Sequence, residues 1–289
     1  MKTNLINKSM HFIRYLSANR KSIYQDFNKN EEILRLLHTE RFQTFFQPIV
    51  SLHNGSTIGY EILNRPEQTP NFPTTDSFYD YVGESKHLFL VERFIRNLAL
   101  ERYQKQVNSL SKKDDAIIFL NIQPQVLADP SYQEGITLDL LSNHNIAANQ
   151  IVLELTEKEA VVNYAKFEKI IEDYRERGFQ IAVDDAGTGY NSLQTLLYLK
   201  PEYIKIDKSL IRNIEEQTEK QHLVELILEF AFKFRTKVIA EGIETAEEFA
   251  YLRKMGVDFG QGYALGKPRP TLHTGTLPGN YINKAIQYI

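Results

Sequence analysis

Acidic residues stand at the downstream ends of four apolar runs in this sequence. These acids are Glu61 in TIGYEIL, Glu154 in IVLELTE, Asp184 and Asp185 in IAVDD, and Glu241 and Glu244 in VIAEGIE. An apolar strand gains nothing in packing from a carboxylate at its end, because a buried charge must be paired. If these strand ends meet at one point, their oxygens make a site for divalent metal ions and a phosphate ester.

Three further polar residues lie in or after apolar runs. Asn121 ends IIFLN, Lys205 lies inside YIKID, and Gln261 follows DFG. Alternation along a strand turns the Lys205 side chain away from those of its isoleucine neighbours. If Lys205 faces inward, the acids could supply its charged partners. Its ammonium group could then hold a water or a phosphoryl oxygen. Gln261 could hold a water or a base edge. Each residue also has a structural reading, with Asn121 and Gln261 in turns and Lys205 outward and solvated.

The donor types indicate which metal ions fit. Carboxylates with an amide carbonyl, from Glu61, Asn121 and Glu154, suit Mg²⁺ or Mn²⁺ better than zinc. The sequence contains no cysteine, and its histidines do not cluster near these strands. Two hard cations need a bridging carboxylate, and Asp184 as the bridge with Asp185 as a ligand of one ion would fit.

The acids have structural readings as well. Asp184 and Asp185 could cap the helix that follows AGTGYNS, and Glu154 could belong to a cap in LTEKE. Glu241 is a candidate metal ligand or acceptor of the proton from an attacking water. Glu244 is a candidate for the same chemistry, but an acid there also suits the positive N-terminal end of the next helix.

Phosphate recognition has one candidate outside the strand ends. Arg65 follows Glu61 by four residues and could hold a phosphate through two hydrogen bonds, or it could form a surface ion pair with Glu67 or another neighbour. AGTGYNS is rich in glycine but has neither the P-loop spacing nor GxGxxG, so a nucleoside triphosphate site is not indicated.

The elements that must position these residues alternate between strands and helices. We expect strands at 45–52, 56–63, 116–122, 151–155, 179–185, 203–207, 237–243 and 259–265, and helices at 90–108, 161–177, 190–199, 218–235 and 245–255. Asn54-Gly55 between the first two strands predicts an antiparallel hairpin. Eight strands predict an α/β fold, a (β/α)₈ TIM-like barrel whose site gathers at the C-terminal strand ends. A doubly wound open sheet is the alternative, but it would use fewer strand ends.

Composition limits the class of protein. The 289 residues have a net charge of −3, with 42% hydrophobic and 25% charged residues, as in an ordinary globular protein. Because there is no overall basic field, duplex nucleic acid is not an expected partner. The sequence has no run of about 18 apolar residues that could cross a membrane, and no signal peptide. With no cysteine, it suits a reducing cytoplasm.

The N-terminus carries a local excess of positive charge. Residues 1–21 contain five basic residues and no acid, a count of +5, interspersed with apolar side chains. This pattern fits either a basic amphipathic helix that contacts a membrane or a partner, or a solvated lead-in helix packed on the domain. The apolar face is short and has no tryptophan, which favours the lead-in helix.

The motifs resemble those of the EAL domain family. FFQPIV, GYEILNR, FLNIQP, LELTE, VDDAGTGY, YIKID, VIAEGIET and DFGQGYALGKP occur in that family's order, and Glu61-Ile62-Leu63 stands where the family name has Glu-Ala-Leu. The resemblance covers about residues 31–270, which leaves 1–30 as a basic helical extension and 271–289 as a tail. It implies a barrel with one antiparallel strand and a phosphodiesterase that opens cyclic di-GMP to linear pGpG with Mg²⁺ or Mn²⁺.

The resemblance also implies roles for individual residues. The metal-ligand positions are Glu61, Asn121, Glu154, Asp184 and Asp185. Lys205 matches the lysine near the nucleophilic water, Glu241 the ligand or general base, and Glu244 and Gln261 the remaining active-site positions. The substrate-contacting positions fall on Gln47, Arg65 and Leu63, and Glu157 matches the glutamate that anchors the loop after Asp185.

Two positions depart from the family pattern. Ile62 replaces the usual alanine, and Ala186 replaces the usual phenylalanine in a loop that couples dimer contact to activity in relatives. Neither change removes a ligand, but the second puts regulation through that loop in doubt. A homodimer is among the candidate assemblies. No GGDEF cyclase signature is present, so the sequence is read as a stand-alone EAL protein. The alternative is a weak or inactive EAL domain that acts as a cyclic di-GMP receptor or an interaction module.

Overall fold

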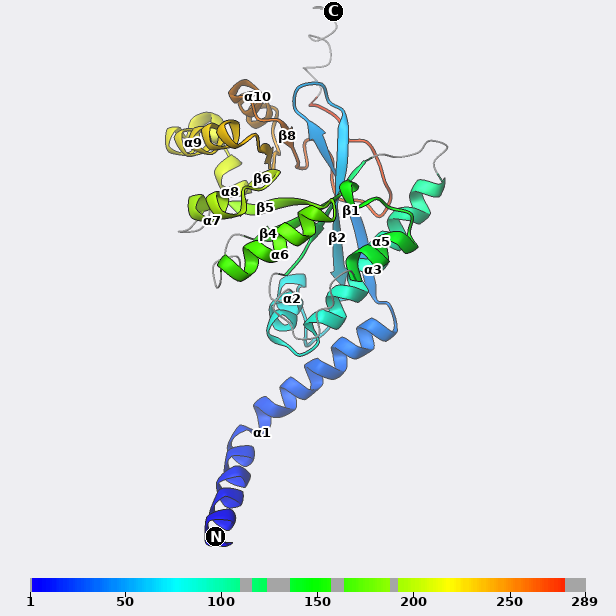
Figure 1. Ribbon diagram of the computed structural model, residues 1–289, viewed down its shortest axis with the longest axis vertical. Helices are drawn as coiled ribbons and strands as arrows, with labels where there is room; N and C mark the ends of the chain where they lie inside the picture. The colour runs from blue at the N-terminus through cyan, green and yellow to red at the C-terminus, as the bar shows by residue number, and fades with distance from the viewer. Residues whose placement is uncertain (1, 110–115, 124–135, 157–163, 188–191, 279–289) are drawn as a thin grey trace, which may run out of the picture. The chain divides into compact units, whose positions relative to one another are not determined.

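Eight strands close into a barrel, and Figure 1 labels most of them with the helices that follow them. The computed structural model describes residues 2–109, 116–123, 136–156, 164–187 and 192–278. The strands are β1 (Phe42–Ser51), β2 (Thr57–Pro66), β3 (Ile117–Asn121), β4 (Ile151–Thr156), β5 (Gln180–Ala186), β6 (Tyr203–Ile206), β7 (Lys237–Ala240) and β8 (Phe259–Gly260). They neighbour one another in sequence order around the barrel, as the alternation of strand and helix patterns predicted.

Strand direction follows the expected pattern. Each pair from β2–β3 to β7–β8 is parallel, whereas β1 pairs with β8 in the antiparallel direction. Since β1 also neighbours β2, it is the one strand among those described that runs against the others. The prediction of a (β/α)₈ TIM-like barrel with one antiparallel strand is confirmed.

Helices connect most of the strands. They are α1 (Lys2–His38), α2 (Thr75–Glu84), α3 (Leu88–Ser109), α5 (Ile136–Asn143), α6 (Tyr164–Glu176), α7 (Ser192–Leu199), α8 (Lys208–Ile211), α9 (Thr218–Phe234) and α10 (Ala246–Met255), with short 3₁₀ turns η1 (Ala148–Gln150) and η2 (Ile214–Glu216). The five helices predicted from the sequence correspond to α3, α6, α7, α9 and α10. The pattern did not reveal α2, α5 or α8, which are short or weakly periodic.

The chain divides into two compact units. The first comprises residues 1–43 and 65–91, and the second comprises 44–64 and 92–289. Within the first unit, the rings of Phe72 and Phe78 pack edge to face with centroids 5.3 Å apart, and the Lys29 ammonium lies 4.8 Å from the centre of the Tyr81 ring. These contacts give the first unit a small aromatic core of its own.

The second unit has apolar side chains on both faces of its strands. A large cluster that includes Ile62, Leu153 and Ile204 joins the strands to the helices. A smaller cluster fills the barrel interior and consists of Ile49, Phe119, Val152, Ala182, Tyr203 and Ile239. Because successive residues of a strand point to opposite faces, the inner cluster fixes which residues face inward at the barrel's end.

Both terminal segments contain described structure. Helix α1 runs without interruption across residue 30, where the sequence placed a boundary. Residues 271–278 bond to the barrel unit, since Leu272 N–H donates to Gln106 Oε1 at 2.6 Å and Thr276 N–H to the Leu265 carbonyl at 2.8 Å.

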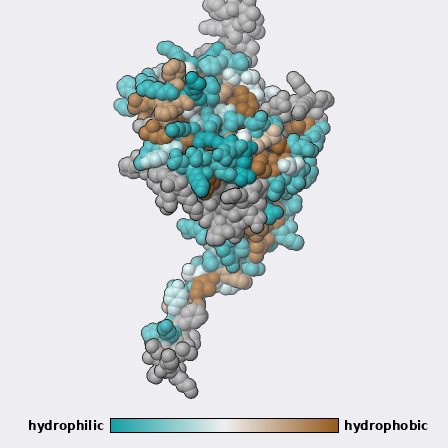
Figure 2. Space-filling view, viewed as in Figure 1, coloured by the Kyte–Doolittle hydropathy of each residue, from teal (hydrophilic) through white to brown (hydrophobic). Residues whose placement is uncertain are grey.

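Part of helix α1 shows apolar side chains to solvent (Figure 2). Leu16, Ile23, Phe27 and Leu34 are each at least 39% exposed, and their spacing of seven, four and seven residues sets them on one stripe. No described helix is long and apolar enough to span a membrane.

Candidate functional site

The predicted site residues form the polar layer above the apolar interior of the barrel. Five of the six residues of the inner cluster are followed, two positions further along the chain, by a polar side chain on the same face: Asn121, Glu154, Asp184, Lys205 and Glu241. On the antiparallel β1, Gln47 lies two positions before Ile49. The strand registers agree, because Asn121 lies beside Glu154 and Thr156 lies beside Asp184. Alternation therefore brings residues from distant parts of the sequence to one end of the barrel.

Lys205 is the centre of this layer. Its side chain is buried, and Nζ lies 2.8 Å from Glu154 Oε1, 2.8 Å from Glu241 Oε1, 3.1 Å from Asp184 Oδ1 and 3.6 Å from Glu61 Oε2. One ammonium group thus faces four carboxylates from four strands or strand ends. The reading of Lys205 as an outward, solvated side chain is wrong.

Glu61 on β2 is held by two amide side chains. Asn121 Nδ2 donates to its Oε1 at 3.2 Å, and Gln261 Nε2 donates to its Oε2 at 2.7 Å. Glu61 and Gln261 are buried, whereas Asn121 is exposed. Each amide donates a hydrogen bond through its nitrogen. Its carbonyl oxygen therefore remains able to accept a hydrogen bond or to bind a cation.

Asp184 and Asp185 reach the same site through an irregularity in β5. The β5–β6 register slips between Val183 and Ala186, so that two residues on β5 stand opposite Lys205 alone. Asp185 has a φ of 55°, a left-handed backbone that is unusual for a residue other than glycine. A bulge of this kind redirects side chains that would otherwise face opposite ways. The Asp185 N–H also donates to Asp184 Oδ1 at 3.0 Å.

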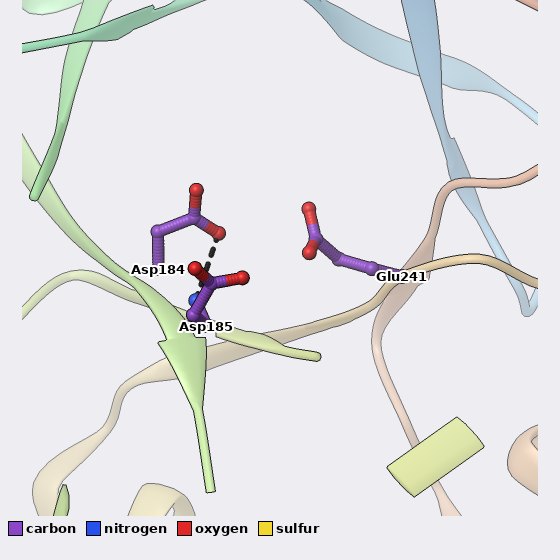
Figure 3. Close-up of side chains that lie close together, drawn as sticks. All are labelled: Asp184, Asp185 and Glu241. Atoms are coloured by element: carbon purple, nitrogen blue, oxygen red, sulfur yellow. Dashed lines mark hydrogen bonds between the residues drawn. The ribbon is translucent and has the colours of Figure 1, made fainter. Parts of the chain in front are cut away.

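Asp184, Asp185 and Glu241 form a cluster that could hold a metal ion (Figure 3). Each offers a carboxylate oxygen, and these oxygens lie within 4.8 Å of one another. Glu241 follows β7 directly, and its N–H donates to the Ile206 carbonyl at 3.0 Å, which ties it to the strand of Lys205. Figure 3 shows its carboxylate facing that of Asp184.

The crowding of charge shifts the pKa values of the buried groups. Burial raises the pKa of Glu154 well above its usual value, and the charges of Glu61 and Asp184 add to this against the effect of Lys205. Burial, with Asp184 and Glu61, likewise raises the pKa of Glu241 to about 8. Burial lowers the pKa of Lys205, but the four carboxylates more than offset this and raise it well above its usual value.

The donor set fits divalent cations. The five acids around the site (Glu61, Glu154, Asp184, Asp185 and Glu241) outnumber Lys205, the cation that faces them among the described residues. In the same part of the chain, Oε2 of Glu154 and Oε1 of Gln261 are buried without a hydrogen-bond donor, whereas Oε1 of Glu154 lies 2.8 Å from the Lys205 ammonium. Unsatisfied buried oxygens and excess negative charge are what a hard cation would stabilise.

Four predicted residues lie apart from the acid cluster. Glu244 is 45% exposed and pairs with Arg212 Nη2 at 2.6 Å, so it is not among the clustered acids. Gln47 donates to the Gly266 carbonyl at 3.2 Å, and Leu63 is half-buried. Arg65 is exposed near the end of β2 and belongs to the other compact unit. Glu67 pairs with Arg41, at 2.8 Å. Glu157 lies outside the described residues.

The two departures from the family pattern face away from the carboxylates. Ile62 is buried in the cluster between strands and helices, on the opposite side of β2 from Glu61. Ala186 is also buried in that cluster, at the end of β5. The larger side chain of Ile62 therefore replaces alanine in a packed layer and not among the acids.

Arg212 and Glu248 also belong to this region, although neither was predicted from the sequence. Arg212 binds Glu244, and Glu248 is fully buried at the start of α10, where it accepts hydrogen bonds from four donors. The spacing Thr245-x-x-Glu248 is a capping-box signal that was readable. Nothing in the sequence pairs Arg212 with Glu244.

The chain belongs to the EAL domain family, which matches residues 30–268. The probable cyclic di-GMP phosphodiesterase PdeB of Escherichia coli strain K12 is 34% identical over 229 residues, which are 78% of this chain and 42% of that protein. PdeG of the same strain, also a probable cyclic di-GMP phosphodiesterase, is 29% identical over 84% of this chain and 48% of its own length. The chain thus spans less than half of these curated relatives.

Solved structures show the same fold. The EAL enzyme Bd1971, in a form with cAMP and cyclic di-GMP bound, has a TM-score of 0.78 and 29% identity, covering 91% of this chain and 71% of its own. A standalone EAL protein from Vibrio cholerae O395, in a cyclic di-GMP bound form, has a TM-score of 0.70 and 28% identity, covering 81% of this chain and 95% of its own.

Proposed function

We propose that this chain is a phosphodiesterase that hydrolyses cyclic di-GMP to linear pGpG with the help of divalent cations. The observation that carries the proposal is Lys205, buried among four carboxylates beside the Asp184–Asp185–Glu241 cluster. Relatives that carry the cyclic di-GMP phosphodiesterase name, and similar structures with cyclic di-GMP bound, support the choice of substrate.

Glu61, Asn121, Glu154, Asp184 and Asp185 would hold two Mg²⁺ or Mn²⁺ ions, with Asp184 shared between them. Glu241 could serve as a further ligand. When bound, such ions polarise a phosphoryl oxygen and lower the pKa of a bound water. The absence of histidine and cysteine from the cluster suits these hard cations better than zinc.

Lys205 and Glu241 would act on the attacking water. The Lys205 ammonium orients the water and balances the charge that develops on the phosphoryl oxygen. Glu241 would accept the proton of that water in its ionised form. In-line attack breaks the bond from phosphorus to the ribose 3′ oxygen and leaves a linear dinucleotide. Glu244 would not contact the attacking water, because its carboxylate is paired with Arg212. It would help to hold the loop after β7 in place.

Substrate contacts would come from Gln47, Leu63, Arg65 and Gln261. The Gln261 Oε1 atom is buried without a donor, so it is available to a substrate group or a water. Arg65 would pair with the phosphate that is not attacked. We keep Glu157 as the anchor of the loop after Asp185.

Three wider assignments also stay proposals. A cytoplasmic location fits an intracellular messenger as substrate, and cell fractionation would check it. A homodimer would be detected by analytical ultracentrifugation. Contact with a partner or a membrane through residues 1–21 would appear in a vesicle sedimentation assay, and its loss on truncation would be the matching control.

The test is incubation of the full chain with cyclic di-GMP and either Mg²⁺ or Mn²⁺, followed by chromatography. Linear pGpG is the expected product, and comparison of the two ions shows which supports turnover. Chelation by EDTA should stop the reaction. If the substrate stays intact with both ions while calorimetry detects cyclic di-GMP binding, the proposed hydrolysis is refuted. The chain would then be a cyclic di-GMP receptor. Neither turnover nor binding would favour an interaction module.

A further inference from the structure

Glu248 is a buried carboxylate outside the acid cluster. It lies in the first turn of α10, and none of its surface is exposed. Among the residues described for this helix, the other buried ones are apolar. A carboxylate buried this deeply must be compensated by hydrogen-bond donors. Its partners show what it does.

The two oxygens of Glu248 bind two different loops. Oε1 accepts from the Asn213 N–H at 3.0 Å and from Arg212 Nη1 at 3.4 Å, in the segment between α8 and η2. Oε2 accepts from the Glu244 N–H at 2.8 Å and the Thr245 N–H at 3.2 Å, in the segment after β7. The first segment follows the strand of Lys205, and the second begins with Glu241.

Arg212 closes the same connection from the other side. Its Nη2 lies 2.6 Å from Glu244 Oε1 while its Nη1 contacts Glu248. Asn213 holds a left-handed backbone with a φ of 53°, a conformation that costs free energy unless its surroundings impose it. The hydrogen bond from its N–H to Glu248 supplies such a restraint.

Two glycines hold the loop after β7 against its neighbours. Gly242 has a φ of 66°, and a β-carbon there would lie 2.5 Å from Lys208 Cβ on α8. A β-carbon on Gly262 would lie 2.2 Å from the Ile243 carbonyl oxygen. The loop is therefore packed closely on both sides, and a shift of its backbone would move Glu241.

We propose that Glu248, with Arg212, is a positioning residue that locks the loops after β6 and β7 together and so holds Glu241 in the metal site. We call this set of contacts the Glu248 bridge: Glu248 with Arg212, Asn213, Glu244 and Thr245. This inference rests on the proposed function, because that function gives Glu241 its role in the metal site. It assigns Glu244 to the bridge and not to the reacting atoms.

A capping role alone is the competing explanation. Thr245 and Glu248 form a capping box, in which the Thr245 side chain accepts from the Glu248 N–H and Glu248 accepts from the Thr245 N–H. Glu248→Gln separates the two roles, because glutamine keeps the volume and one acceptor oxygen. That oxygen can serve the capping box, but the amide nitrogen would then face the Asn213 N–H as a second donor.

The first measurement is the affinity of the full chain for Mn²⁺. The electron paramagnetic resonance signal of free Mn²⁺ reports how much of the ion is bound. We expect Glu248→Gln to weaken binding about tenfold, the effect typical of groups that orient metal ligands. Glu247→Gln is the matched control, since Glu247 is an exposed acid in the same turn. Equal affinity of wild type and Glu248→Gln would show that Glu248 only caps α10.

The second measurement is amide hydrogen exchange, which does not depend on the reaction. In Glu248→Gln the Asn213 amide should exchange at least tenfold faster, while amides within α10 keep their rates. Unchanged exchange at Asn213 would refute the bridge. If wild type binds no Mn²⁺, the proposed function fails, but exchange still decides the bridge. If Glu248→Gln does not fold, Arg212→Gln replaces it and should speed exchange at Glu244.

Discussion

Replacement of Lys205 by methionine tests the central charge of the site. Methionine is unbranched and of similar length, so the change removes the charge with little loss of packing. Each ion pair near 3 Å is worth about 5 kcal/mol at an effective dielectric constant of about 20, but the cost of burial offsets most of this. Loss of one partner of a buried pair typically costs about 3–5 kcal/mol. We expect a loss near the lower end, because Glu154 and Glu241 can take up protons.

Proton uptake gives this prediction a distinctive pH dependence. Without the ammonium group, the raised pKa values of Glu154 and Glu241 rise further, so the folded variant binds more protons than the folded wild type. Lowering the pH therefore favours the variant relative to wild type. The difference in free energy of unfolding should be about 3 kcal/mol at pH 7 and smaller at pH 5. Added Mg²⁺ or Mn²⁺ should restore part of it, since cations compensate the same acids.

Urea denaturation in EDTA, repeated with each cation, measures these differences. Lys237→Met is the matched control, because Lys237 is 56% exposed and pairs at 2.9 Å with Asp258, which directly precedes β8. An exposed pair of this kind contributes about 0–1 kcal/mol. A loss for Lys205→Met no larger than for this control, or a loss that grows as the pH falls, would contradict the reasoning.

Much of the site could be predicted because strand alternation is a local rule. Each inward apolar residue, such as Val152 or Tyr203, is followed two positions later by a polar one, here Glu154 or Lys205. A pattern of this kind predicts both the direction of the side chain and the end of the barrel at which it lies. Closure of the sheet then follows from the number of such strands.

The bulge in β5 could not be predicted in the same way. Regular alternation would send Asp184 and Asp185 to opposite faces, and only the register slip with a left-handed Asp185 directs both to one site. The cost of that backbone must be met by the surrounding structure, which the local sequence does not reveal. The strand also continues to Ala186, one residue beyond the predicted end at 185.

Partners distant in sequence were also beyond local patterns. Glu244 was assigned to chemistry from its motif, and its ion pair with Arg212 depends on how the loops after β6 and β7 pack. Glu67 suited Arg65 by proximity in sequence, yet it pairs with Arg41. Side chains with long, flexible stems have many candidate partners, so their pairing follows from the fold.

Three further perturbations test the proposed site. Glu61→Ala should lower turnover of cyclic di-GMP at least 100-fold, as expected for loss of a metal ligand; turnover within tenfold of wild type in a folded variant would refute that role. Deletion of residues 1–21 should leave hydrolysis unchanged, and a folded but inactive truncation would show that α1 has a catalytic role. In EDTA, the free energy of unfolding should fall as the pH rises from about 4.5 to about 8, because folded Glu241 keeps a proton that the unfolded chain releases. The decrease should be on the order of a few kcal/mol, and Glu241→Gln should reduce it. A rise in stability over this range for wild type, or an equal decrease in Glu241→Gln, would place the titrating group elsewhere.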